Sequence, residues 1–239
     1  FATDIIVDAE RVQKIPDAMP YDEASCLVLT YGTSHHALKN RAEIKAGESL
    51  LIMGAAGGVG VAAIELAKAA GARVIAAVSS EDKAQFCRDL GADETIIYSR
   101  DMDDRATQKA FSDEIKKLSG GEGVDVVYDA VGGAYAEPAV RALAWKGRYL
   151  VVGFPAGIPK IPLNLTLLKG SQIMGVFWGA HTAREPKVHA ENMADLFRMY
   201  ADGQIKPRIS ARYPLEKAAD ALNLMQDRKV QGKVVLDVQ

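Results

Sequence analysis

A run of closely spaced glycines carries the clearest chemical signal in this sequence. The segment Gly54–Gly60 reads Gly-Ala-Ala-Gly-Gly-Val-Gly and follows the apolar run Ser49–Met53. Glycine lets a backbone come close to a pyrophosphate, and Gly60 allows the next helix to pack tightly on the strand. The free N–H groups of that helix's first turn then face the anion. The pattern therefore predicts a dinucleotide site, although Ala55 takes the place of the first glycine of GxGxxG. The residues expected around the pyrophosphate are Ala56, Gly57, Gly58 and Val59.

The residues after the second strand indicate which dinucleotide is bound. An NAD site usually has Asp or Glu there, which accepts hydrogen bonds from the ribose 2′-hydroxyl. This chain has Ser79 and Ser80 instead, with Lys83 one helical step further on. Hydroxyl groups and an ammonium suit a 2′-phosphate, so we expect NADPH, with Arg100 as a candidate second cation.

Composition excludes several classes of partner. The formal net charge is −2 and the sequence pI is near 6.1, which argues against nucleic acid or an anionic membrane as a partner. No apolar run approaches the roughly 20 residues of a membrane span. The only cysteines, Cys26 and Cys87, are too few and too distant for a disulfide framework or a CxxC pair. We expect a cytoplasmic protein.

Strand and helix patterns alternate along most of the chain. Strand-like runs at 49–54, 72–78, 94–98, 124–128, 148–153 and 172–177 are separated by helical patterns at 59–70, 81–90, 101–118, 135–143 and 163–169. Short links between such elements predict an α/β fold, a doubly wound parallel sheet of the Rossmann type. Before it, Tyr21–Asn40 is expected to be helical with an interruption at Gly32.

Both ends of the chain follow a different pattern. Ile5–Val7 is strand-like and begins close to Phe1, so we expect a further segment upstream. At the other end, helical patterns at 188–201 and 215–226 alternate with strands at 208–213 and 233–238. These elements are expected to form part of a second domain.

Eight stretches together resemble the zinc-free NADPH:quinone oxidoreductase group, the zeta-crystallin-like branch of the medium-chain dehydrogenases/reductases. They span nearly the whole chain in family order and comprise Leu29–Leu38, Gly54–Gly60, Ser79–Lys83, Leu90–Asp93, Ile97–Tyr98, Val124–Asp129, Val152–Phe154 and Gly232–Leu236. The resemblance implies a GroES-like catalytic domain interrupted by the nucleotide domain, with most of its first portion outside this chain. It implies residues 1–29 and 178–239 in the catalytic domain and 30–177 in the NADP-binding domain.

The same resemblance suggests further cofactor contacts. Tyr98 is expected beside the adenosine 2′-phosphate, and Lys233 belongs to a segment that returns toward the cofactor. For Phe177 and Trp178, burial at a subunit contact is an equal alternative. The residues expected near the nicotinamide half are Thr33, Val131, Gly153, Phe154, Pro155, Phe177, Trp178 and Gly179.

Metal chemistry is tested by comparison with the zinc alcohol dehydrogenases of the same superfamily. In those enzymes a cysteine zinc ligand lies four residues before the threonine that matches Thr33. The corresponding residue here is Leu29, and Cys26 lies three residues too early to replace it. The four histidines show no ligand spacing. We expect no metal.

The resemblance implies an NADPH-dependent oxidoreductase that transfers hydride to quinones or α,β-unsaturated carbonyls, with a small-molecule substrate and no zinc. Two alternatives remain open: an enoyl-thioester (acrylyl-CoA-like) reductase, and an NADPH-binding module without turnover. The sequence identifies no catalytic acid or base. A homodimer is expected through the edge strand at 172–177.

Overall fold

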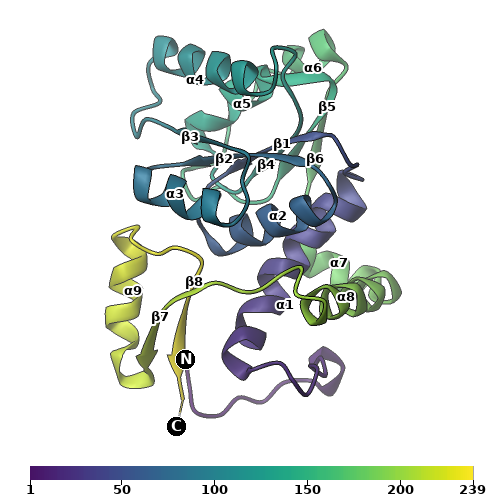
Figure 1. The fold of residues 1–239 in the computed structure, drawn as a ribbon, viewed down its shortest axis with the longest axis vertical. Helices are drawn as coiled ribbons and strands as arrows, with labels where there is room; N and C mark the ends of the chain where they lie inside the picture. The colour runs from purple at the N-terminus through teal and green to yellow at the C-terminus, as the bar shows by residue number, and fades with distance from the viewer. Residues whose placement is uncertain (239) are drawn as a thin grey trace.

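The computed structural model describes residues 1–238, apart from the side chain of Glu10. The chain forms a six-stranded sheet and a separate two-stranded sheet. Figure 1 shows the larger sheet between two layers of helices in the upper half, with the smaller sheet and further helices below it. All six strands are parallel and lie in the order β3-β2-β1-β4-β5-β6. This is the Rossmann order, which reverses between β1 and β4. The strands are β1 (Ser49–Met53), β2 (Arg73–Val78), β3 (Glu94–Ile97), β4 (Val124–Asp129), β5 (Leu143–Val151) and β6 (Gln172–Gly175).

Helices cover both faces of this sheet. On one side lie α2 (Gly58–Ala69) and α3 (Glu81–Asp89), and on the other lie α4 (Arg105–Leu118), α5 (Ala136–Arg141) and α6 (Asn164–Lys169), as Figure 1 shows. The α/β class and the doubly wound parallel sheet expected from the alternating pattern are confirmed.

Side chains that alternate along each strand form a hydrophobic core on both faces of the sheet. In β1, Leu50 and Ile52 pack toward α2, whereas Leu51 and Met53 pack toward α4 and α5. All of β1 is buried. A strand covered on both faces favours apolar residues throughout, which explains the unbroken apolar run Leu50–Met53.

The remaining elements lie against α2 and below it. The long helix α1 (Tyr21–His35) packs on α2 and on α8 (Pro186–Ala201), and it continues into a π-helical turn at His36–Arg41. Strands β7 (Ile209–Pro214) and β8 (Lys233–Asp237) pair in parallel, with α9 (Ala218–Gln226) between them in sequence. The other short elements are α7 (Trp178–Arg184) and 3₁₀ turns at Ala9–Arg11, Gly133–Tyr135 and Leu215–Lys217.

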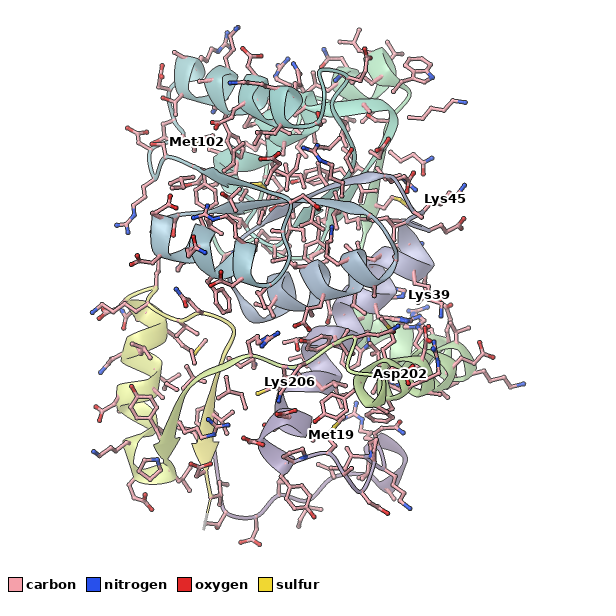
Figure 2. The ribbon with its side chains drawn as sticks, viewed as in Figure 1. Met19, Lys39, Lys45, Met102, Asp202 and Lys206 are labelled. Atoms are coloured by element: carbon pink, nitrogen blue, oxygen red, sulfur yellow. The ribbon has the colours of Figure 1, made fainter. Side chains whose placement is uncertain are left out.

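One buried carboxylate joins these parts. Glu65 of α2 accepts hydrogen bonds from Tyr31 Oη of α1 (2.7 Å) and from the backbone N–H of Lys206 (2.8 Å), with Arg208 Nε at 3.4 Å. Figure 2 shows Lys206 close to α1 in the lower half of the molecule. Burial raises the pKa of Glu65. A carboxylate held by these donors fixes α1 and the chain leading to β7 against the sheet domain.

Two expectations about the elements are wrong, and one helix was not expected. Ile5–Val7 is not a strand, because these residues are exposed and pair with no described residue. Helix α1 runs through Gly32 without interruption, since Gly32 is where the indole of Trp178 packs on the helix: a Cβ there would lie 2.8 Å from Trp178 Nε1. Finally, Trp178–Arg184 forms a helix that the sequence pattern did not reveal.

Candidate functional site: a dinucleotide crevice

The glycine segment forms the turn that the sequence predicts. Strand β1 ends at Met53, Gly54 has a positive φ of 72°, and α2 begins at Gly58 with Gly57 as its N-cap. A Cβ at Gly60 would lie 2.5 Å from the carbonyl oxygen of Ala55. Only glycine fits this close approach of helix and strand, and the first N–H groups of α2 have no carbonyl within the helix to bind. The turn therefore offers N–H donors to an anion.

The C-terminal segment closes over this turn. The N–H of Gly232 donates to the carbonyl of Ala56 (2.8 Å), and Gly57 and Gly232 form an isolated parallel bridge. A Cβ at Gly58 would lie 2.8 Å from Lys233 Cδ, so the lysine side chain lies over the start of α2. The structure thus brings Lys233 to the predicted pyrophosphate loop, 175 positions after Gly58 in sequence.

Three cationic side chains lie near one another beyond the end of β2: Lys83, Arg100 and Arg228. Ser79 and Ser80 are half-buried there, and the Nζ of Lys83 donates to the backbone carbonyl of Arg228 (2.8 Å). Burial, then the nearby charges of Arg100 and Arg228, lower the pKa of Lys83. Like charges held together at a strand's carboxyl end are stabilised when an anion binds between them.

Two tyrosines lie beside these cations. Tyr98 packs edge-on against Tyr135, with ring centroids 4.9 Å apart, and Tyr135 Oη donates to the carbonyl of Ser99 (2.9 Å). Burial, and then Tyr135, raises the pKa of Tyr98 to about 12, while Arg228 acts in the opposite direction. Both phenols are therefore neutral hydrogen-bonding groups at neutral pH, next to the guanidinium of Arg228.

Sequence reasoning missed Arg228. It lies in the turn after α9 with a positive φ of 58°, and 145 residues separate it from Lys83. A signal was available in its spacing: Arg228 precedes Gly232 by four residues, and Gly232 is part of a stretch already expected to return to the cofactor.

Asp129 shapes the other half of the crevice. This buried carboxylate ends β4 and accepts hydrogen bonds from the N–H groups of Val131 (2.8 Å) and Gly132 (2.9 Å), and from Tyr149 Oη. Burial raises the pKa of Asp129. Its backbone carbonyl also accepts from the N–H of Gly153 (3.2 Å). One residue thus positions the loops that follow β4 and β5, a role that the sequence did not indicate.

Most residues expected near the nicotinamide half come from these two loops. Val131 contacts Gly54, where a Cβ would lie 3.0 Å from Val131 Cγ2, so the loop after β4 touches the glycine turn. Gly153 is half-buried, whereas Phe154 and Pro155 are exposed. The loops after β1, β4 and β5 therefore meet at the carboxyl edge of the sheet, where the strand order reverses.

Trp178 approaches the same edge from α7. Its indole packs on Gly32 of α1, next to Thr33, and its ring meets His189 edge-on at 5.6 Å. Thr33 Oγ1 donates to the carbonyl of Leu29 (2.7 Å). Phe177 is 75% exposed and Gly179 is also exposed, so both are open to a ligand or to another protein surface.

A hydrogen-bonded chain connects α1, α2 and β4 beneath the crevice. Ser34 Oγ donates to the carbonyl of Val59 (2.8 Å) and lies 2.9 Å from the hydroxyl of Tyr128. The carbonyl belongs to the first turn of α2, so this chain holds the pyrophosphate turn in register with the sheet.

Two other properties bear on the chemistry of this chain. Among the side chains that the structure describes, which leave out those of Glu10 and Gln239, no group of three or more His, Cys, Asp or Glu is arranged to hold a metal ion. No helix in this described part has both the length and the apolar character needed to cross a membrane.

Comparisons with known proteins agree with this geometry. Residues 58–195 match the family described as zinc-binding dehydrogenase. The quinone oxidoreductase-like protein 2 of Rattus norvegicus is 36% identical over 240 residues, which cover all of this chain and 66% of the rat protein. The chain thus spans just under two thirds of the length of that relative.

Two solved structures extend the comparison. Mycobacterial Rv1454c, complexed with NADPH, is similar with a TM-score of 0.87 and 30% identity, over 95% of this chain and 69% of that one. The CurK enoyl reductase has a TM-score of 0.81 and 30% identity, over 97% and 67% of the two chains. The family match covers more than half of this chain, and the chain shares its fold with Rv1454c at a TM-score of 0.87. The chain therefore belongs to the zinc-binding dehydrogenase family, as its resemblance to the quinone oxidoreductases led us to expect.

Proposed function

We propose that this chain binds NADPH and belongs to an oxidoreductase that reduces quinones or α,β-unsaturated carbonyls without zinc. The observation that carries the cofactor assignment is the cation group Lys83, Arg100 and Arg228 beyond a strand that ends in two serines rather than in a carboxylate. A 2′-phosphate brings two negative charges to this position, which a ribose 2′-hydroxyl does not.

The residues present fit a dinucleotide along the whole crevice. At Gly60 a Cβ would collide with the backbone, and at Gly58 with Lys233, so the turn has no room for side chains of its own. We propose that N–H groups from Ala56 to Val59 hold the pyrophosphate, with Lys233 adding a positive charge above them. Ser79, Ser80 and Tyr98 would bind the phosphorylated ribose beside Lys83 and Arg228.

The nicotinamide ring then lies at the loops after β4 and β5. Bound NADPH supplies the hydride. Val131 and Gly153 would border the ring, with Thr33, Phe154 and Pro155 around them, while Phe177, Trp178 and Gly179 would form a wall that orients the acceptor and excludes water. Asp129 acts as a positioning residue, because it fixes two of these loops and is itself buried.

A zinc ion is not required for this chemistry. A hydrogen bond to the acceptor oxygen is enough to stabilise the enolate or hydroquinone anion that forms as hydride arrives. We propose that residues 30–177 bind the cofactor and that residues 1–29 and 178–239 belong to a GroES-like catalytic part.

An enoyl-thioester reductase is the second candidate, favoured by the similarity to the CurK enoyl reductase. Both candidates use the same cofactor crevice and differ in the acceptor. The test is NADPH oxidation by this chain, and by a fusion in which a relative supplies the first portion of the catalytic part, with a quinone, an enone and an enoyl thioester as acceptors. Turnover with the quinone or enone supports the first proposal, and turnover with the thioester alone supports the second. Binding of NADPH without turnover in either form would leave a nucleotide-binding module.

We further propose a homodimer formed through β6. This strand pairs only with β5 within residues 1–238, and its Ile173 is 37% exposed. Exposed apolar side chains lie on neighbouring segments, at Trp145, Leu163, Leu167 and Phe177. An open apolar edge invites pairing with a second copy of the same strand.

A further inference from the structure

A groove lies on the opposite face of the sheet from α2, between α4, α5 and α6. Its volume is about 560 Å³, a size that accommodates a small organic ligand. Val140 of α5 and Leu165 of α6 are buried at its floor, and Leu168 lies exposed at its lip. None of its lining residues belongs to the dinucleotide crevice.

One face of α4 lines the groove with cations. Arg105, Lys109, Ser112 and Lys116 are spaced by four, three and four residues, so they share a helical face. Arg141 of α5 and Lys169 of α6 lie across from them. The groove therefore has five cationic side chains.

Only two carboxylates line the groove, and both are already engaged. Asp113 pairs with Lys109 at 2.6 Å and lies 3.9 Å from Lys116, whereas Glu137 pairs with Arg141 at 2.6 Å. Among the side chains that the structure describes, no carboxylate lies within 4.0 Å of Arg105 or of Lys169. The groove thus retains an excess of positive charge.

Lys169 is held in place at the end of α5. Its Nζ donates to the carbonyl of Arg141 (2.9 Å) and to that of Leu143, where the helix presents carbonyl groups. Burial, and then the charge of Lys116, lower the pKa of Lys169. Lys116 and Lys169 both line the groove and carry like charges, so an anion bound there would be attracted by both.

A buried hydroxyl group lies among these charges. Ser112 is 3% exposed, and its Oγ has no hydrogen-bond partner among the described residues. Leaving a buried donor unpaired costs about 1–3 kcal/mol. Ser112 lines the groove but its Oγ is covered, so an acceptor atom in the groove would satisfy the hydroxyl once the side chains that cover it move aside.

From these contacts we infer that the groove between α4, α5 and α6 binds a phosphate monoester, whose dianion lies between Lys116, Lys169 and the hydroxyl of Ser112 and whose organic part covers Val140 and Leu165. Three phosphate oxygens match several donors converging from different sides better than a single carboxylate does. The apolar floor distinguishes an organic phosphate from inorganic phosphate, because only the former buries apolar surface on Val140 and Leu165.

The test uses phenyl phosphate and inorganic phosphate as probes of the intact chain, with binding followed by calorimetry and by the amide resonances of α4 and α5. Phenyl phosphate should bind more tightly than inorganic phosphate and shift the resonances of Ser112 and Val140. Lys116→Gln should weaken phenyl phosphate binding about tenfold, since it removes one charge-assisted hydrogen bond. Ser112→Ala should weaken it roughly fivefold.

Two matched variants make the result decisive. Lys117→Gln removes the same charge from the same turn of α4 but lies outside the groove, so it should leave binding unchanged. Lys83→Ala alters the dinucleotide crevice and should also leave it unchanged. An equal loss in Lys117→Gln, a loss confined to Lys83→Ala, or no shift at Ser112 and Val140 would overturn the inference. Lys116→Gln, Lys117→Gln and Lys83→Ala should keep the thermal midpoint of the ligand-free natural chain within about 3 °C, whereas Ser112→Ala, which removes an unpaired buried hydroxyl, should not lower it.

Discussion

The side chain of Lys83 and the backbone of Arg228 meet beyond the end of β2, where the Nζ of Lys83 donates to the carbonyl of Arg228 over 2.8 Å. The two residues come from distant parts of the sequence: Lys83 lies on α3 of the sheet domain, and Arg228 lies in the turn after α9. This contact brings the C-terminal segment to the adenosine end of the crevice, in the same way that Gly232 brings it to the glycine turn. Cofactor selection therefore depends on residues that are far apart in sequence.

Replacing Arg228 by Ala should weaken NADPH binding about tenfold to hundredfold, the effect of losing a charge-assisted contact to the 2′-phosphate. NADH lacks that phosphate, so its affinity should change little. Fluorescence titration of both nucleotides measures the difference. Lys187→Ala, which removes an exposed cation from α8, is the control and should change neither affinity. Equal losses for both nucleotides would mean that Arg228 does not contact the phosphate.

Gly60→Ala tests the pyrophosphate turn. The added Cβ would lie 2.5 Å from the carbonyl oxygen of Ala55, so strand and helix must separate. We expect a loss of roughly 1–3 kcal/mol in the free energy of unfolding, together with much weaker binding of both nucleotides. Gly175→Ala is the matched control, since nothing lies within 4 Å of its Cβ position. A Gly60→Ala chain as stable as Gly175→Ala would contradict the close approach.

The pH dependence of stability should report on Asp93, which joins α2 to β2. Burial acts to raise the pKa of this carboxyl, but hydrogen bonds from Lys68 Nζ (2.8 Å) and the Val74 N–H (2.7 Å) outweigh it, so the pKa lies below its ordinary 3.8. Its contribution to stability is therefore present above the unfolded-state pKa and is lost as the pH falls through the folded-state value.

Asp93→Asn should accordingly be less stable than the natural chain near neutral pH, and its free energy of unfolding should fall less steeply below about pH 4. Lys68→Met, which removes one of the two donors, should give an intermediate slope. Denaturant titrations across that range measure the slopes. Parallel curves for the natural chain and Asp93→Asn would show that the carboxylate is not stabilised by folding.

The edge of the sheet gives a prediction about assembly. Ile173→Lys places a charge on β6 at the proposed subunit contact, where burying it between two copies would be costly. We expect dimers of the natural chain and monomers of the variant in sedimentation velocity, with unchanged unfolding of the monomer. Leu222→Lys, on the exposed side of α9, is the control. A natural chain that sediments as a monomer at micromolar concentration would refute the proposed contact.

Local patterns predicted the sheet domain well. The glycine turn, the serines after β2 and the alternating strands and helices follow from short segments whose residue types restrict the backbone, such as the wholly buried β1. The predictions that failed depend on contacts between residues far apart in sequence. Gly32 looked like a helix interruption, but its missing side chain makes room for Trp178, which lies 146 positions further along. Helix α7 has only seven residues, too few turns to show a helical period of apolar residues in the sequence.

The candidate site divides in the same way. Ser79, Ser80 and Lys83 were recognisable because they follow one strand, whereas Arg228 could be placed only through the path of the C-terminal segment. Asp129 directly follows a strand predicted at 124–128, but its role in holding two loops depends on Tyr149 and on backbone groups that approach it only in the folded chain. Such roles require three-dimensional structure.

The most direct test of the proposed function is the ratio of the dissociation constants of NADH and NADPH for the natural chain. The cations beyond β2 predict that NADPH binds at least about tenfold more tightly, and that raising the salt concentration reduces this preference. Equal affinities for the two nucleotides, or a preference for NADH, would contradict the assignment.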